Sequence, residues 1–212
     1  MADLKIYCNG IACLKAEGRT KDIHAALEQL PRQFSKRDPL AYLDGKSFED
    51  YIHDMELCQR FAELNRRAMV RVITESMNLQ PNAVWQTIHN YIDIEHMILR
   101  KGAISAQEGG RVIIPMNMRD GSLICIGKGN PDWNYSAPHG AGRLMSRSNA
   151  FKNIQMDEFQ RDMSGIASWS VCESTKDGAP GVYKPMQSIV SQIEPTVEVE
   201  RIFRPVYNYK AH

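Results

Sequence analysis

From Asp44 onward, apolar residues recur at the three- and four-residue spacing of a single helix face, from Phe48 to Ile73. Ser47, followed by Asp50 three residues later, can cap the first turn. We therefore predict a long amphipathic helix over about 47–77. Its other face carries charges of both signs, for which solvent exposure is the simpler interpretation and RNA contact the alternative: Glu56, Arg60, Glu63, Arg66 and Arg67.

The remaining elements are shorter. Residues 83–99 are predicted to be helical or extended, and the small and glycine-rich residues of 100–110 indicate a structured loop. The hydrophobic spacing predicts strands over 112–114, 122–126, 167–171 and 197–203, and helices over 22–30, 156–163 and 186–193. Because helices and strands mix without a regular strand–helix repeat, the expected fold class is α+β, with mixed sheets and surrounding helices.

Composition narrows the class of protein. The 212 residues can bury a substantial core, and 43% hydrophobic and 24% charged residues are typical of a globular protein. No run approaches the roughly 20 apolar residues of a membrane helix, and the start lacks signal-peptide features, so we expect a cytoplasmic protein without a membrane partner. The five cysteines contain no CxxC pair, which argues against a disulfide framework or a zinc ribbon. A net charge of +1 argues against nucleic-acid binding through bulk positive charge, so local arginines and lysines would have to hold RNA.

The densest candidate chemistry is SAPHGAGRLMSR, residues 136–147. His139 precedes the small residues Gly140–Gly142, where the backbone can approach a ligand and offer N–H groups to phosphate oxygens. Arg143 and Arg147 add planar cations suited to phosphate. Neutral imidazole is a competent nucleophile near pH 7. A histidine that attacks phosphorus and a buried histidine in a glycine-rich turn are both compatible with this spacing.

Two further segments carry candidate chemistry. Within IHNYIDIEH, residues 88–96, His89 lies near other side chains that can bind metals, but the spacing matches no established zinc pattern. Metal binding and a structural role therefore both remain open for His89. The loop GKGN, residues 127–130, has two glycines like a phosphate loop but lacks the further glycine and lysine of nucleotide-binding fingerprints.

Together with several other blocks, these motifs resemble one family, the RtcB RNA ligases. The resemblance extends from about residue 40 to the end of the chain. We therefore expect 1–39 to be a divergent N-terminal segment of unknown role and 40–212 to be an RtcB-like C-terminal catalytic region. The matching blocks, in order, are HNYID at 89–93, RKGAISA at 100–106, IIPMNMRDGSLICIGKGN at 113–130, SAPHGAGRLMSR at 136–147, APGVYKPM at 179–186 and the terminal YNYKA.

The resemblance implies an RtcB-like fold and a ligase that uses GTP and manganese. Such an enzyme joins RNA ending in a 3'-phosphate or 2',3'-cyclic phosphate to RNA beginning with a 5'-hydroxyl, as in tRNA splicing or RNA repair. The family's nucleophilic histidine falls on His139, which would carry GMP, and its metal-binding histidine falls on His89. Residues implied to contact the guanine nucleotide are Ser122, Gly140, Ala141, Gly142, Arg143, Tyr183 and Lys210.

The chain departs from the family pattern in three places. The family's upstream Asp/Cys metal motif, Asn-His nucleotide motif and further metal histidine are not recognisable before residue 40, and Cys8 and Cys13 lack the expected setting. IPMNM replaces a glycine-serine form, and Gly178 stands where an acidic residue is usual. Three interpretations remain: an RNA ligase whose missing half was removed or lies on a second polypeptide that supplies the metal ligands, a non-catalytic guanine-nucleotide or RNA-binding relative, and a histidine phosphotransfer enzyme that acts on a small molecule.

Overall fold

The structure is a computed structural model that describes residues 42–210. The chain divides into two units, Met1–Phe48 and Glu49–His212, and the elements that form the site all lie in the second unit. The predicted helix over 22–30 lies outside the described residues, and the predicted division between 1–39 and 40–212 stays a prediction.

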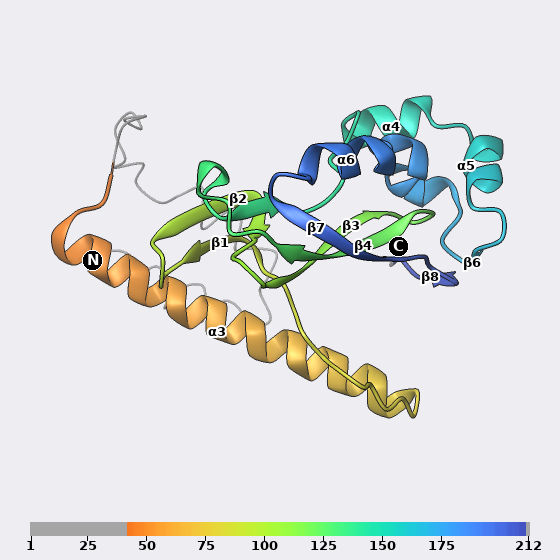
Figure 1. The fold of residues 1–212 in the computed structure, drawn as a ribbon. Helices are drawn as coiled ribbons and strands as arrows, with labels where there is room; N and C mark the ends of the chain where they lie inside the picture. The colour runs from red at the N-terminus through yellow and green to blue at the C-terminus, as the bar shows by residue number, and fades with distance from the viewer. Residues whose placement is uncertain (1–41, 211–212) are drawn as a thin grey trace, which may run out of the picture. The chain divides into compact units, whose positions relative to one another are not determined.

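The predicted amphipathic helix is α3, Gly45–Ser76 (Figure 1). It begins at Gly45, so Ser47 lies inside its first turn and is not the N-cap that the sequence suggests. No residue of α3 is buried. On its charged face Arg60 donates to Glu63 at 2.7 Å, a one-turn pair of the kind that solvated helix surfaces carry.

The first sheet has the antiparallel order β1-β2-β5, with β1 at His89–Asp93, β2 at Ile98–Ser105 and β5 at Ser136–Pro138. The helical alternative for 83–99 is therefore wrong, since the described part of that segment forms no helix. The loop predicted over 100–110 is wrong for its first half, which belongs to β2. Gly102 is typical of a loop, but a glycine inside a strand can also mark a bulge, a bend or a close approach by another group.

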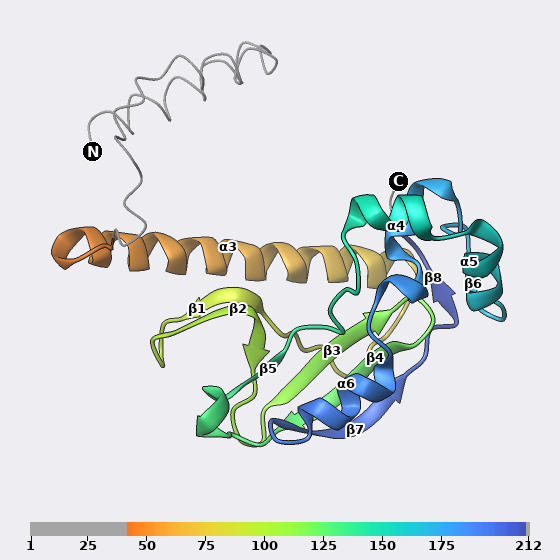
Figure 2. The ribbon, with the colours of Figure 1, turned by 90° about the horizontal axis from the view of Figure 1, so that it is seen from above.

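The second sheet has the order β3-β4-β7 and is antiparallel throughout. Its strands β3 (Arg111–Asn117), β4 (Gly121–Gly127) and β7 (Val197–Phe203) confirm the predicted ones, the first two being longer than expected. Helix α6, Met186–Ile193, lies across this sheet (Figure 2). Its apolar side packs on the sheet's inner face, and the buried cluster includes Ile189, Ile193, Ile114 and Leu123. This cluster is the main core.

A second, smaller core joins the short helices that lie between β5 and α6 in the chain. Buried members include Phe159 of α5 (Met156–Asp162) and Val182 of the 3-10 turn η3 (Pro180–Val182). The predicted strand over 167–171 shrinks to β6, Ala167–Ser168, which pairs in parallel with β8, Tyr207–Asn208. The remaining elements are η1 (Pro131–Trp133), α4 (Arg147–Asn153) and η2 (Glu173–Gly178).

The arrangement confirms the α+β class, because residues 42–210 form three small sheets together with several helices and show no strand–helix repeat. In the part of the chain that the structure describes, no helix is both long and apolar enough to cross a bilayer.

Candidate active site

A cavity of about 880 Å³ is lined by the start of β1, the turn between β3 and β4, the glycine-rich segment after β5 and the residues that follow β7. The histidines, the glycine-rich turn and the C-terminal lysine come from segments far apart in the sequence, yet all contribute to its wall. The residues that the family resemblance assigns to the site all line this cavity, whereas Arg147 does not: His89, Ser122, His139, Gly140, Ala141, Gly142, Arg143, Tyr183 and Lys210. The fold thus brings the candidates together, while the role of each stays a prediction.

The imidazole rings of His89 and His139 lie next to each other in the lining of the cavity. The ring centroids of His89 and His139 are 4.8 Å apart, with the ring planes tilted by 42°. A bulge at Asn90, whose φ is 53°, sets the direction of His89, and the Asn90 side chain accepts a 2.6 Å hydrogen bond from the Gly102 N–H. The His139 N–H in turn donates to the Gly102 carbonyl at 3.3 Å. The strand pair β1-β2 therefore positions the backbone of both histidines.

Gly102 suits its position because of its backbone conformation, since a Cβ atom there would meet only ordinary van der Waals contact. A Cβ atom built there would lie 4.0 Å from Cδ2 and Nε2 of His139, and its φ of +69° is unfavourable for any other residue.

The environment of His139 favours its neutral form. Partial burial lowers the pKa of the imidazole, and the neighbouring His89 lowers that pKa further because two positive rings would repel each other. Unprotonated imidazole keeps a lone pair on one nitrogen, which is the form that can attack an electrophile.

The glycine-rich turn presents backbone donors beside His139. The Ala141 N–H is already used, because it donates to the Pro115 carbonyl at 3.1 Å. A Cβ atom at Gly140 would lie 3.2 Å from the same Pro115 carbonyl oxygen, which is a tight contact. Gly142 has a φ of +72°, a conformation that favours glycine. The N–H groups of Gly140 and Gly142 donate to none of the residues that the structure describes. They are therefore available to an anion in the cavity.

Three cationic residues line the cavity, Arg143, Arg204 and Lys210. Arg143 lies over the ring of Tyr183, 5.3 Å from its centroid, and donates from Nη2 to the Asp177 carbonyl at 2.6 Å. Lys210 donates from Nζ to the Asp177 carboxylate at 2.6 Å. Arg147, by contrast, points outward with 80% of its side chain exposed, and its Nε lies 3.6 Å from the same carboxylate.

Comparison with known proteins places these features in a family. The family described as tRNA-splicing ligase RtcB matches residues 16–211 of this chain. The chain belongs to the RtcB family. It is 32% identical to the RNA-splicing ligase RtcB of Escherichia coli, over 88% of this chain and 49% of that protein. It is 28% identical to the tRNA-splicing ligase RtcB of Pyrobaculum aerophilum, over 71% of this chain and 39% of that protein.

This RtcB family member spans about half the length of its E. coli relative. The family match begins at residue 16, so the similarity extends further toward the N-terminus than the motifs after residue 40 indicate.

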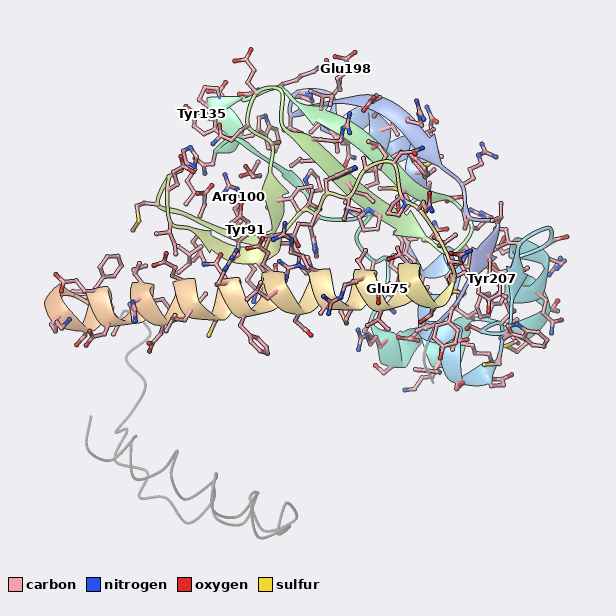
Figure 3. All side chains as sticks on the ribbon, turned by 90° about the horizontal axis from the view of Figure 1, so that it is seen from below. Glu75, Tyr91, Arg100, Tyr135, Glu198 and Tyr207 are labelled. Carbon is pink, nitrogen blue, oxygen red and sulfur yellow. The ribbon has the colours of Figure 1, made fainter. Side chains whose placement is uncertain are left out.

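The metal-capable side chains of residues 88–96 do not converge in this RtcB protein. Only His89 of that segment lines the cavity. Asp93 instead accepts from Nη1 of Arg100 at 2.6 Å, and its other oxygen lies 3.0 Å from Nδ1 of His96 (Figure 3 labels Arg100). Among residues 42–210, no three or more His, Cys, Asp or Glu side chains gather in a way that could hold a metal ion. The described residues therefore supply one candidate metal ligand, not a site.

The GKGN loop of this RtcB chain has a structural role. The Gly129 N–H donates to the Ala106 carbonyl at 3.0 Å, and Lys128 pairs with Glu194 at 2.5 Å. Its residues do not line the cavity. The apparent phosphate loop thus uses its polar groups within the protein.

Sequence reasoning missed Asp177, which contacts the cavity-lining residues Arg143 and Lys210. The sequence does carry one signal for this residue, since Asp177 is acidic and directly precedes Gly178, which lines the cavity. Nothing in the sequence alone, however, indicates that a residue 33 positions away from Lys210 is its partner.

Proposed function

We propose that this chain carries the nucleotide-binding and nucleophilic part of an RNA ligase. The enzyme would use GTP to join RNA 3'-phosphate or 2',3'-cyclic phosphate ends to 5'-hydroxyl ends, as in tRNA splicing or RNA repair. The observation that carries the proposal is the cavity in which His139 lies beside open backbone donors and two cations. Membership of a family whose relatives are named RNA-splicing ligases supports RNA as the substrate. A cytoplasmic location goes with this proposal.

In the first step, a nitrogen of His139 would attack the α-phosphorus of GTP. A nitrogen–phosphorus bond forms, the bond from phosphorus to the bridging oxygen breaks, and pyrophosphate leaves with the electron pair. The GMP would then pass to the RNA 3'-phosphate, and the 5'-hydroxyl of the second RNA end would displace it. The open N–H groups of Gly140 and Gly142, together with Arg143, are suited to bind the phosphate oxygens.

The base end of the nucleotide is assigned to Tyr183 and Lys210. An aromatic ring can stack on a purine, and an ammonium can donate to the guanine carbonyl. Removal of residues 208–212 should therefore weaken GMP binding in calorimetry. Lys210→Gln should do the same without removing β8, whereas Lys152→Gln, an exposed change in α4, should leave binding unaltered. Equal GMP affinity in all of these variants would contradict the assignment.

Manganese is the metal that the family resemblance implies. His89 could contribute one imidazole ligand, but tight binding requires several ligands in fixed geometry, and residues 42–210 do not supply them. We propose that the other ligands come from a second chain or from residues outside the described part. Metal binding to this chain alone should then be weak.

The central experiment follows the covalent adduct. The protein, alone or with the partner that completes it, is incubated with radiolabelled GTP and manganese and then separated by denaturing electrophoresis. His139→Ala should abolish the labelled band while changing the unfolding free energy by no more than about 1 kcal/mol. His96→Ala, a change of a half-exposed histidine outside the cavity, should retain the band. A band that persists in His139→Ala would place the nucleophile elsewhere.

A second function is favoured by the incomplete set of metal ligands among residues 42–210. The chain would be a non-catalytic relative that binds guanine nucleotide or RNA. It would bind GMP without forming the adduct under any of the conditions above, and that combination distinguishes it from the ligase.

A further inference from the structure

We propose that Asp177 is the positioning residue of the nucleotide site, fixing Lys210 and Arg143 in the orientation in which they meet the ligand. This inference rests on the proposed function of the cavity. Asp177 belongs to η2, and only 16% of its side chain is exposed. Its carboxylate accepts from Lys210 Nζ and its carbonyl accepts from Arg143 Nη2, each at 2.6 Å. One residue outside the cavity lining thus contacts two of the three cationic residues that line the cavity.

Lys210 is held at both ends. Its N–H donates to Ser170 Oγ at 2.8 Å, and that hydroxyl is also 3.1 Å from the Lys210 carbonyl, so the backbone is anchored. The ammonium is anchored by Asp177, which uses one of its three donors and leaves two for a ligand. A lysine side chain that is already immobile loses less conformational freedom when a ligand binds. Asp177 should therefore increase affinity rather than the rate of chemistry.

Gly178 provides the space for this arrangement. A Cβ atom at position 178 would lie 2.9 Å from Lys210 Nζ, closer than Cβ atoms in proteins are found to other atoms. The ammonium therefore occupies the volume that a side chain would take. Gly178→Ala should displace Lys210 from the cavity side while leaving Asp177 intact, which makes it an independent second variant.

Asp177→Asn separates the two cavity contacts, because it keeps the backbone carbonyl that binds Arg143 and removes the charge that binds Lys210 and, outside the cavity, the exposed Arg147. GMP affinity of the full chain is measured by calorimetry. The adduct rate is measured against GTP concentration, in the same preparation and with the same partner as above. Asp157→Asn, in an exposed pair with Arg161, is the matched control.

We expect Asp177→Asn to weaken GMP binding, and to raise the GTP concentration giving half-maximal rate, by about 3- to 10-fold. The maximal rate should stay within about twofold, because His139 is untouched. Asp177→Glu should recover part of the affinity, and Gly178→Ala should reproduce the loss. Lys210→Gln and the double variant Lys210→Gln/Asp177→Asn should bind GMP equally, since Asp177 acts through Lys210.

Different results overturn different claims. Wild-type protein that binds GMP and forms the adduct, with Asp177→Asn indistinguishable from Asp157→Asn, overturns the role of Asp177 alone. A lower maximal rate at unchanged affinity, or additive losses in the double variant, also overturns it. Wild-type protein that neither binds GMP nor forms the adduct overturns the proposed function, and the inference with it. If Asp177→Asn lowers the melting temperature strongly, Gly178→Ala decides the question.

Discussion

Arg100 carries a buried positive charge in β2, and removing its acidic partner should destabilise the protein. Only 2% of Arg100 is exposed. Its Nη1 donates to Asp93 at 2.6 Å and to the Tyr91 hydroxyl at 3.2 Å, and its Nε donates to Ser136 at 2.9 Å. These bonds connect all three strands of the first sheet. Asp93→Asn keeps the shape of the side chain but leaves the guanidinium without a counter-charge.

Breaking a buried ion pair by removing one partner typically costs about 3–5 kcal/mol. The loss should be smaller here, since the amide oxygen of the substituted side chain could still accept one hydrogen bond and 12% of the Asp93 side chain is exposed. We expect Asp93→Asn to lower the unfolding free energy by about 2–3 kcal/mol at pH 7. The exposed pair of Asp157 and Arg161 offers the comparison, and Asp157→Asn should change the unfolding free energy by less than about 1 kcal/mol.

The effect should also depend on pH. Burial by itself would raise the pKa of Asp93, but hydrogen bonds from Arg100 and His96 outweigh burial and lower that pKa. The stabilisation is then fully present above the unfolded-state pKa of about 3.9 and is lost as the pH falls through the lower folded-state pKa. Urea unfolding at several pH values should show the unfolding free energies of the wild-type protein and of Asp93→Asn converging as the pH falls below about 4. A loss at pH 7 no larger than that of Asp157→Asn would refute this account of Arg100.

Two further predictions test the second sheet and the cysteines. Gly121→Ala should lower the unfolding free energy by more than about 2 kcal/mol, because its Cβ would lie 1.9 Å from the Phe203 carbonyl at a φ of +81°. Gly109→Ala, with a φ of +72° but nothing within 4 Å, should cost about 1 kcal/mol, and equal urea midpoints would contradict the steric argument. Burial raises the pKa of Cys125 to about 11, whereas hydrogen bonds from two neighbouring hydroxyl groups lower the pKa of Cys172. At pH 8 iodoacetamide should therefore modify Cys172 well before Cys125, as judged by peptide mass spectrometry, and equal labelling of the folded protein would contradict it.

Elements with an unbroken hydrophobic period could be predicted from the sequence. Helix α6 and strand β7 have the bounds that the pattern indicates, and α3 differs by only a turn or less at each end. In each case one face repeats over at least two turns or several strand residues, so local spacing carries the information.

Elements with mixed local signals were less predictable. The start of β2 contains a buried arginine and a glycine, which are typical of neither a strand nor a core. Tertiary contacts explain both residues: Arg100 is stabilised by Asp93 across the sheet, and Gly102, which has a positive φ, is hydrogen-bonded to Asn90 and His139. Contacts of this kind override local propensity and leave no periodic trace in the sequence.

The candidate site followed the same division. Its cavity-lining residues could be named from motifs because they lie in short, distinctive blocks. The residues that support them could not, since Asn90 and Asp177 act through contacts with Gly102 and Lys210 that only the fold creates.

The two ends of the candidate site depend on different parts of the fold. His89 and His139 are held by the first sheet, whereas Lys210 is held by η2 and the segment after β6. The segment that follows His139 is connected to the second sheet by a hydrogen bond from the Ala141 N–H to the Pro115 carbonyl of β3. Pro115 lies opposite Ser122, which is itself opposite Phe203 of β7. The backbone of Gly121 lies so close to the Phe203 carbonyl that a side chain would not fit, and this contact fixes the register of β4 and β7 at this end of the sheet. The same end of the sheet carries Pro115, whose carbonyl contacts the glycine-rich turn. Contacts through the second sheet therefore connect the segment that carries His139 to the end of β7, a strand that precedes Lys210 in the chain.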